Sequence, residues 1–267
     1  MIAPDVAVIG GSGFYSLLDG AEEVVVETPF GAPSDAITVG TVGDRRVAFL
    51  PRHGRDHSVP PHRINHRANL WALRSVGCRQ ILAPCAVGAL DPALVPGTIV
   101  LPDQVVDRTT GREQTFFDTG AVHVPFADPY CPVGRATVAA VASRSGRPAV
   151  ERGTMVVIPG PRFSSRAESR WYAAQGFTLV NMTGLPEAAL ARELALCYTA
   201  IALVTDLDAG IDDGHESVSQ AEVFRVFAEN TERLRAMILD VVTDLPADRK
   251  CPCAGAHDGI TLPFALP

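Results

Sequence analysis

The stretch VNMTGLPEAALARELALCYTAIALVTDLD, residues 180–208, decides the fold that the sequence predicts. Its middle, residues 187–196, contains only Ala, Leu, Arg and Glu, which are good helix formers. Residues 199–204 form a short apolar run, which is typical of a strand covered on both faces. The stretch therefore predicts a strand end, a tight turn, a helix and a buried strand.

The residues that end the two predicted strands are the best candidates for a ligand site. Asn181, Met182 and Thr183 end the first strand, and Asp206 and Asp208 come just after the second. In an open α/β sheet, ligands bind outside the carboxyl ends of the strands. We therefore expect these five residues to line one site.

Length and composition favour a single globular domain. The chain has 267 residues, of which 47% are hydrophobic, enough to bury a substantial core. The sequence has no repeat of 20–50 residues, no low-complexity segment and no clear linker. We therefore expect one domain that spans residues 1–267.

Charge and hydropathy argue against several classes of partner. The net charge of −7 disfavours nucleic acid and anionic membranes, because both require a basic face. No apolar run reaches the roughly 18 residues of a membrane span, and the N-terminus lacks the basic start of a signal peptide. We expect a cytoplasmic protein with small-molecule ligands.

The six cysteines predict core packing rather than a metal site. Four of them are isolated and lie in or beside apolar segments, at positions 78, 85, 131 and 197. These are expected to be small buried residues of a cytosolic protein. Cys251 and Cys253 are spaced more closely than a zinc-type C-x-x-C and have no second pair. A redox-sensitive pair is the alternative for these two cysteines.

A glycine turn follows the first predicted strand and is typical of an anion site. Residues 10–14 read GGSGF, and such a turn leaves backbone N–H groups available to an anion, with Ser12 as a further donor. The alternative is a dinucleotide fingerprint. It fits poorly, because the third glycine position of G-x-G-x-x-G falls on Ser16.

A second anion-binding motif ends an expected antiparallel meander between residues 23 and 50. Arg52, His53 and Arg55 follow its last strand, and arginine suits an oxyanion because it offers a bidentate fork. The alternative is a solvated basic turn. The histidines of this region, His53, His57, His62 and His66, do not predict a metal site, because Pro60 and Pro61 interrupt any helix and no carboxylate pattern completes the ligand set.

Other segments predict the surroundings of the site. Small residues at 84–90 allow a ligand to approach the backbone. Residues 107–130 form a long polar stretch, expected to be functional or to cover an interface. Phe163 precedes a helix start capped by Ser164 or Ser165, and it either stacks on a flat ring or anchors the loop. The apolar tail, residues 262–267, should be docked, and a neighbouring subunit is one candidate.

Five segments together resemble the trimeric purine nucleoside phosphorylase family, and most closely its 5′-methylthioadenosine phosphorylase branch. They are VAVIGGSGFY (6–15), PRHGRDHSVPPHRINHRANLWAL (51–73), GPRFSSRAES (160–169), VNMTGLPEAALARE (180–193) and CYTAIALVTDLDAG (197–210). The resemblance implies one α/β domain with a central mixed β-sheet flanked by helices, the nucleoside phosphorylase fold. It also implies a homotrimer with sites at the subunit interfaces.

The implied reaction is reversible phosphorolysis of 5′-methylthioadenosine to adenine and 5-methylthioribose 1-phosphate, in purine and methionine salvage. Inorganic phosphate is the co-substrate, and no metal or organic cofactor is expected. The resemblance assigns phosphate to Ser12, Arg52, His53, Ala86 and Thr183. It assigns the base to Phe163, Asn181, Asp206 and Asp208, the ribose to Met182, and the 5′ group to Val223 with His123 and the tail of a neighbouring subunit.

The chemistry agrees with these assignments. Cleavage of an N-glycosidic bond builds positive charge on the sugar and negative charge on the purine. A positioned phosphate supplies the nucleophile, and a strand-end carboxyl with a raised pKa can protonate purine N7. Asp206 and Asp208 are therefore the expected catalytic residues.

Several alternatives remain. They are a 6-oxopurine nucleoside phosphorylase, a nucleosidase that uses water, a dinucleotide-dependent oxidoreductase and a non-catalytic nucleoside-binding module. Ser12 replaces the Thr of many family members, and residues 209–214 depart from the family pattern, so the 5′ substituent stays undecided.

Overall fold

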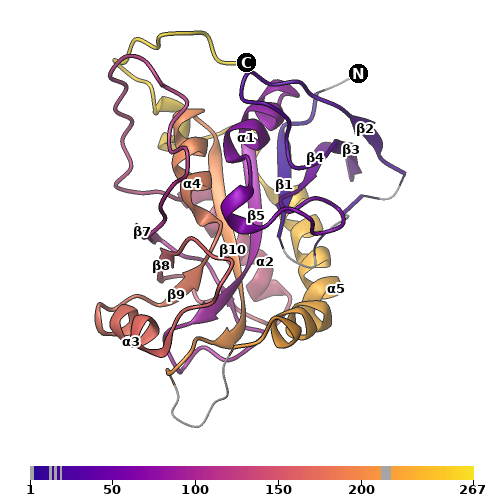
Figure 1. Cartoon of the computed structure of the whole chain (residues 1–267). Coiled ribbons are helices and arrows are strands. Elements are labelled where there is room, and N and C mark those ends of the chain that lie inside the picture. Colours follow the sequence, from indigo (N-terminus) through magenta and orange to yellow (C-terminus); the bar gives the residue numbers. More distant parts are fainter. Residues whose placement is uncertain (1–2, 12–13, 15–16, 19, 212–217) are drawn as a thin grey trace.

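The computed structural model describes residues 3–11, 14, 17–18, 20–211 and 218–267 (Figure 1). Within these residues, ten strands form one mixed sheet in the order β2-β3-β4-β1-β5-β9-β8-β7, with β10 paired to β5 and β6 paired to β10. The strands are β1 (Val6–Gly10), β2 (Glu22–Val24), β3 (Ile37–Val42), β4 (Arg45–Pro51), β5 (Gln80–Ala89), β6 (Ile99–Val100), β7 (Gln104–Asp107), β8 (Thr154–Val157), β9 (Leu179–Asn181) and β10 (Cys197–Leu207).

Helices cover both faces of this sheet (Figure 1). The helices are α1 (His66–Ser75), α2 (Pro132–Arg144), α3 (Arg166–Ala174), α4 (Gly184–Glu193) and α5 (Gln220–Asp244), with 3-10 turns η1 (Pro61–Arg63) and η2 (Pro252–Gly255). Alternate residues of β1 face opposite ways, as strand geometry requires. Ala7 and Ile9 join the core beneath α1 and α4, whereas Val6 and Val8 join the core beneath α2 and α5. The expected α/β fold class is confirmed.

The centre of the sheet is the parallel pair β5 and β10, registered from Gln80 opposite Cys197 to Ala89 opposite Leu207. β5 is longer than the sequence suggests, because the small residues after position 83 continue the strand instead of leaving it. β10 includes Asp206, which the sequence places just beyond the strand. The two strands therefore carry the candidate residues on rigid backbone.

The local elements agree with the sequence in part. The meander is confirmed, since β2, β3 and β4 pair antiparallel. Outside the named strands Val150 forms one isolated bridge with Val100, and β7 was not foreseen from the sequence. Within the described residues β1 is followed by β2 and not by a helix, which argues against a dinucleotide fold. None of the helices in the described residues combines the length and apolar character needed to cross a bilayer.

Helix starts follow the expected capping chemistry. Ser165 accepts a hydrogen bond from the Glu168 backbone, and the Glu168 carboxylate accepts one from the Ser165 backbone, which completes a capping box. Ser219 caps α5 by accepting a hydrogen bond from Glu222 N at 3.2 Å. Both caps fix segments that border the site described below.

The C-terminal tail packs on its own chain, so the expectation that this apolar segment is docked is confirmed. The ring of Phe264 lies 5.3 Å from that of Phe117 and 5.9 Å from that of Trp71. Leu266 packs against the core beneath α1 and α4. In Figure 1 the tail lies beside the C-terminal label, at the end of the molecule opposite α3.

Four cysteines that are distant in the sequence gather at the start of β10. The Sγ atoms of Cys131, Cys197, Cys251 and Cys253 all lie within 4.8 Å of one another. The expectation that Cys131 and Cys197 are buried is confirmed. The expectation that the C-terminal pair has no second pair is wrong in space, because these two cysteines supply one. Sequence spacing could not reveal the cluster, because it forms only when the chain end folds back onto β10.

Candidate active site

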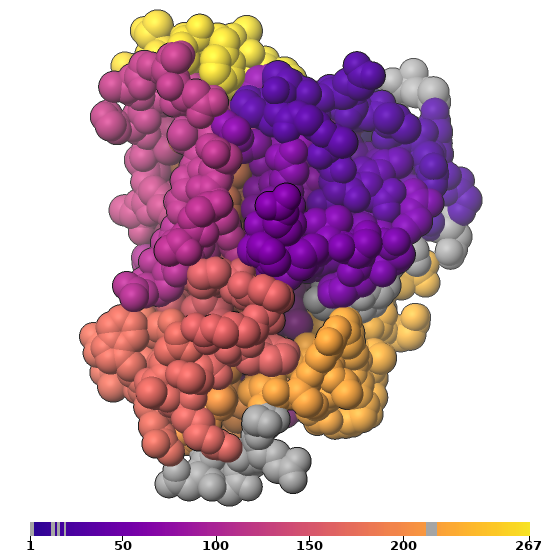
Figure 2. Space-filling view, in the orientation of Figure 1, coloured from indigo at the N-terminus to yellow at the C-terminus, as the bar shows by residue number. Residues whose placement is uncertain are grey.

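A cavity of ≈ 420 Å³ opens beyond the carboxyl ends of β1, β4 and β10. Figure 2 shows this face hollowed where the N-terminal segment, the segment before α3 and the start of α5 meet. Ten of the predicted site residues line the cavity: Arg52, His53, Ala86, Phe163, Asn181, Met182, Thr183, Asp206, Asp208 and Val223.

The two remaining predicted residues are placed differently. Ser12 lies outside the described residues. His123 is exposed and does not contribute to the cavity as the described residues form it. A role for His123 therefore requires a second copy of the chain.

Arg52 anchors one end of the cavity and is buried in a charged network. Its Nε and Nη2 donate to the two carboxylate oxygens of Glu187 at 2.7 and 2.8 Å, and Nη1 donates to Pro84 O at 3.2 Å. Tyr198 Oη donates to Glu187 Oε1 at 2.7 Å, and His66 Nδ1 lies 3.5 Å from Oε2. Burial opposes ionisation of Glu187, but the Arg52 charge and hydrogen bonds outweigh it and hold the Glu187 pKa below its usual range.

Glu187 is the residue that sequence reasoning missed in this network. The sequence indicates only a helix former there, yet the side chain is 0% exposed. Charged side chains are almost never fully buried without a partner. A carboxylate in the first turn of a helix otherwise rich in Ala and Leu was therefore a usable signal, since a buried carboxylate implies a buried cation.

His53 presents a neutral imidazole to the cavity. Burial is the main cause that lowers its pKa to about 4, and its Nδ1 lies 2.9 Å from Val59 O. A carbonyl only accepts, so Nδ1 carries the proton and Nε2 is left as an acceptor. The His53 ring lies 4.6 Å from that of His57, which in turn meets the edge of Phe224 from α5 at 5.4 Å.

The second arginine of the motif points elsewhere, which corrects the expectation that both arginines bind an anion. Arg55 is exposed and pairs with Asp35 at 2.8 Å and Glu23 at 2.9 Å. The solvated-turn interpretation therefore holds for Arg55, whereas the buried Arg52 belongs to the cavity.

Asn181 organises the turn that follows β9. Its Oδ1 accepts from the backbone N of Thr183 at 2.8 Å and of Gly184 at 2.7 Å, and its Nδ2 donates to Ala86 O at 3.1 Å. The side chain expected to contact a base is thus largely committed to backbone. This arrangement places Thr183 at the cavity wall, where its hydroxyl lies at the start of α4.

A β-bulge between Val204 and Asp206 aims the end of β10 into the cavity. The bulge lets Asp206 lie opposite Gly88 of β5. A Cβ at Gly88 would come 3.1 Å from Asp206 Oδ1 and 3.3 Å from Asp208 Cβ. Glycine therefore makes room for both carboxyl groups.

Each of the two aspartates lies against a hydroxyl group, Asp208 buried and Asp206 half-buried. Thr205 Oγ1 lies 2.7 Å from Asp206 Oδ2, and Ser169 Oγ donates to Asp208 Oδ2 at 2.6 Å. Burial is the main cause that raises the pKa of Asp206 to about 6, and burial also raises the pKa of Asp208. This end of the cavity can therefore exchange a proton near neutral pH.

Arg112 is a positioning residue that the sequence did not single out. It comes from the long polar stretch after β7 and donates to three carbonyls: Leu185 O at 2.6 Å, Pro159 O at 2.7 Å and Met182 O at 2.8 Å. One side chain therefore ties together the turns that follow β8 and β9. The stretch from 107 to 130 was expected to be functional or to cover an interface, but no local pattern in the sequence singled out Arg112 within it.

The fold and the cavity define a class of protein that sequence comparison identifies directly. Residues 5–243 match the Phosphorylase superfamily, and the chain belongs to this family.

Two relatives match over nearly their whole length. The S-methyl-5′-thioadenosine phosphorylase of Mycolicibacterium smegmatis is 58% identical, with 97% of this chain and 98% of that protein covered. The Purine nucleoside phosphorylase of Streptomyces coelicolor is 57% identical, with 100% and 99% covered. Among solved structures, Methylthioadenosine phosphorylase from Schistosoma mansoni in complex with adenine has a TM-score of 0.88 and 39% identity, over 92% of this chain and 93% of that chain.

Proposed function

We propose that this protein catalyses the reversible phosphorolysis of 5′-methylthioadenosine, or a related 5′-deoxyadenosine, to adenine and 5-methylthioribose 1-phosphate. The observation that carries the proposal is that one cavity has a buried, paired arginine at one end and two carboxyls with raised pKa values at the other. Its ≈ 420 Å³ lies within the range of small-ligand sites. The name of the 58% identical relative, S-methyl-5′-thioadenosine phosphorylase, supports the same reaction, and that of the 57% identical relative, Purine nucleoside phosphorylase, supports the broader reaction class.

Phosphate binds at the Arg52 end, with Ala86, Thr183 and Ser12 as further contacts. Glu187 holds the Arg52 guanidinium in place and offsets part of its charge. The neutral His53 accepts a hydrogen bond through Nε2, so it binds a phosphate that still carries a P–OH proton. A phosphate held in this way is an oriented nucleophile beneath the sugar carbon whose positive charge develops.

The purine binds at the aspartate end. Asp206 in its protonated form donates to N7 as negative charge builds on the leaving base. A carboxylate accepts from an exocyclic amino group and repels an oxo group, so the aspartates favour 6-aminopurines. The 6-oxopurine alternative is weaker for that reason. Phe163 stacks on the base and Met182 contacts the ribose. Asn181 acts by holding the turn that follows β9.

The site is completed by a second subunit in a homotrimer. Val223 lines the cavity at the start of α5, where the 5′ group lies, and an exposed His123 from a neighbour adjoins it. The reaction needs no metal or organic cofactor, and the enzyme works in the cytoplasm on small molecules. Light scattering should give three chains per particle at micromolar concentration, and a monomer with full activity would contradict this assembly.

The test of the function is phosphate dependence. Adenine release from methylthioadenosine should require phosphate, and equal rates in phosphate-free buffer would instead establish a hydrolase. Arg52→Lys keeps the buried charge beside Glu187 but loses the bidentate fork, so it should raise the KM for phosphate more than that for the nucleoside. Arg55→Lys, in the same loop but paired on the surface, is the matched control and should leave both KM values unchanged.

A further inference from the structure

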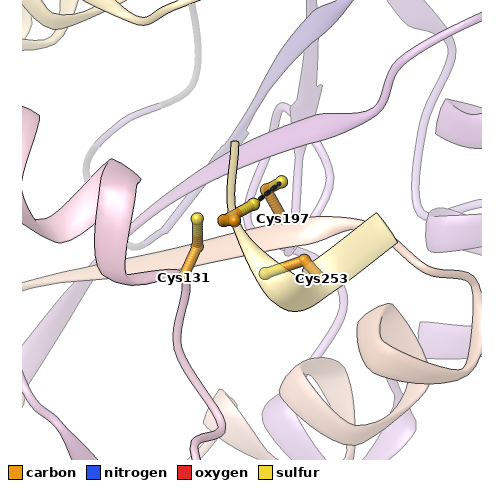
Figure 3. Close-up of side chains that lie close together, drawn as sticks. Cys131, Cys197 and Cys253 are labelled. Atoms are coloured by element: carbon orange, nitrogen blue, oxygen red, sulfur yellow. Dashed lines mark hydrogen bonds between the residues drawn. The ribbon is translucent and has the colours of Figure 1, made fainter. Parts of the chain in front are cut away.

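The cluster of four cysteines lies at the amino end of β10, away from the cavity. Figure 3 shows Cys131, Cys197 and Cys253 converging on a common space, and Cys251 Sγ lies 3.3 Å from Cys197 Sγ. Three of the four side chains are buried, and Cys251 is partly exposed. They come from the N-cap of α2, the first residue of β10 and the turn η2.

We propose that these four cysteines bind one structural Zn²⁺ ion. All four Sγ atoms lie within 4.8 Å of one another. Four thiolates about 2.3 Å from a tetrahedral zinc are separated from each other by about 3.8 Å, so the cluster closes on the ion with small side-chain movements. Tetrahedral coordination by four sulfurs is characteristic of zinc or iron, and a closed set of four cysteines is typical of structural zinc sites. Each thiol that becomes a ligand releases its proton to solvent.

The arrangement favours a metal over two separate disulfides. A disulfide brings two sulfur atoms to about 2.05 Å and places no demand on a second pair. Here every sulfur is near the other three, which a tetrahedral site requires and pairwise bonding does not. The backbone N of Gly134 also donates to Cys131 Sγ at 3.4 Å, the kind of outer contact that orients a thiolate ligand.

The electrostatic surroundings suit an ion with four thiolates. Such a centre carries a net negative charge, and Cys131 is the N-cap of α2, where the helix presents unpaired N–H groups and a partial positive charge. The side-chain thiol thus occupies the anion-binding end of a 13-residue helix. This placement stabilises the thiolate state that zinc requires.

The role of the ion would be to tether the chain end. Cys251 and Cys253 follow α5 and precede the tail that packs on Phe117 and Trp71. Four protein ligands leave no coordination position open for a substrate. Asp206 lies nine positions along β10 from Cys197, which is roughly 30 Å of strand. The site is therefore structural and separate from the reaction.

The first test uses the wild-type chain, produced with zinc in the medium and purified under mild reduction without chelator. Elemental analysis should give one zinc per chain. Replacement by Co²⁺ should give the visible bands and the thiolate charge-transfer absorption of tetrahedral sulfur coordination. Iron in place of zinc, or no metal with six titratable thiols, would overturn the proposal. So would disulfides between these cysteines, detected by intact mass without reduction.

Variants then locate the ion. Cys253→Ala and Cys78→Ala remove the same atom from equally buried positions, since the two residues are 1% and 0% exposed. Cys253→Ala removes a direct ligand, so it should weaken zinc binding by more than the roughly 10–100-fold that follows loss of a residue contacting a ligand. Cys78→Ala should keep one zinc per chain. Equal zinc content in both would overturn the assignment. If Cys253→Ala fails to fold, zinc release from the wild type, followed with a metallochromic dye as these four thiols are titrated, provides the same test.

Discussion

The two ends of the cavity hold charge in opposite ways. At one end Arg52 and Glu187 are fully buried and bonded to each other through two hydrogen bonds, so both charges persist over the working pH range. At the other end Asp206 and Asp208 meet hydroxyl groups and no cation within the described residues, and burial raises both pKa values. A fixed charge positions a nucleophile, whereas a carboxyl that titrates near neutrality can deliver a proton.

The difference also determines how each end affects the stability of the folded protein. A buried ion pair with both partners in place is tolerated, but removing one partner leaves an unpaired buried charge. A buried carboxyl whose only partners are hydroxyl groups destabilises the folded state when it ionises. Mutation at the Arg52 end should therefore lower the free energy of unfolding, and mutation at the aspartate end should raise it.

The largest effect should come from breaking the fixed pair. Glu187→Gln removes the negative charge beside Arg52, and we expect the free energy of unfolding to fall by about 3–5 kcal/mol, as for other broken buried pairs. Urea unfolding measures it. Glu222→Gln, which breaks an exposed pair with Arg225, is the matched control and should change stability by no more than about 1 kcal/mol. A similar small change for Glu187→Gln would remove the contrast between the two ends.

The next effect is on catalysis at the titrating end. Asp206→Asn loses the proton donor to N7, and we expect kcat/KM for methylthioadenosine to fall by about 10²–10⁴-fold. Its amide N–H would suit an oxo group, so activity on methylthioinosine should rise relative to methylthioadenosine. Asp240→Asn, an exposed carboxylate on α5, is the control. An unchanged ratio between the two substrates would refute the role of Asp206 in reading the base.

The same substitution should stabilise the fold above the pKa of Asp206. The folded pKa is about 6 and the ordinary value is 3.8, so the native state binds the proton more tightly than the unfolded chain. The destabilisation caused by ionised Asp206 in the folded state is therefore complete above pH 6. It disappears as the pH falls from 6 towards 3.8. Asp206→Asn should gain about 1–3 kcal/mol over wild type at alkaline pH, and the gain should shrink at pH 5. A gain independent of pH would contradict a titrating Asp206.

The contrast between the two ends explains what the sequence could and could not predict. Asp206 and Asp208 stand two residues apart after an apolar run, so local pattern was enough to place them at a strand end. Arg52 was found in the same way. Its partner Glu187 lies 135 residues later, and only the tertiary fold brings the two together. The cysteine cluster was missed for the same reason, since its members span residues 131–253.

The fold itself was predictable to the extent that each element carried its own signal. Helix caps at Ser165 and Ser219 and the buried runs of β1 and β10 identify themselves by residue type. The bulge at the end of β10 does not, because it arises from pairing with β5 and from the space that Gly88 leaves. Short edge elements such as β7 also lack a local pattern.

The smallest effect should come from Arg112, which links the two ends without touching either. Arg112→Ala leaves the carbonyls of Pro159, Met182 and Leu185 without this donor, so the turns that carry Met182 and Thr183 should shift by a fraction of an ångström. We expect kcat/KM to fall about tenfold, below the 10² that a 1 Å misplacement can cost.

The readouts of this variant separate positioning from chemistry. The pH profile of kcat should keep its shape, because Asp206 is unchanged, and Arg112→Lys should recover part of the loss through one of the three hydrogen bonds. Arg108→Ala removes another arginine of the same region, one that stacks on Trp171 at 5.2 Å, and should leave kcat/KM near wild type. A shifted pH profile in Arg112→Ala would mean that the arginine acts on the proton donor itself. The two ends would then be electrostatically coupled and not independent.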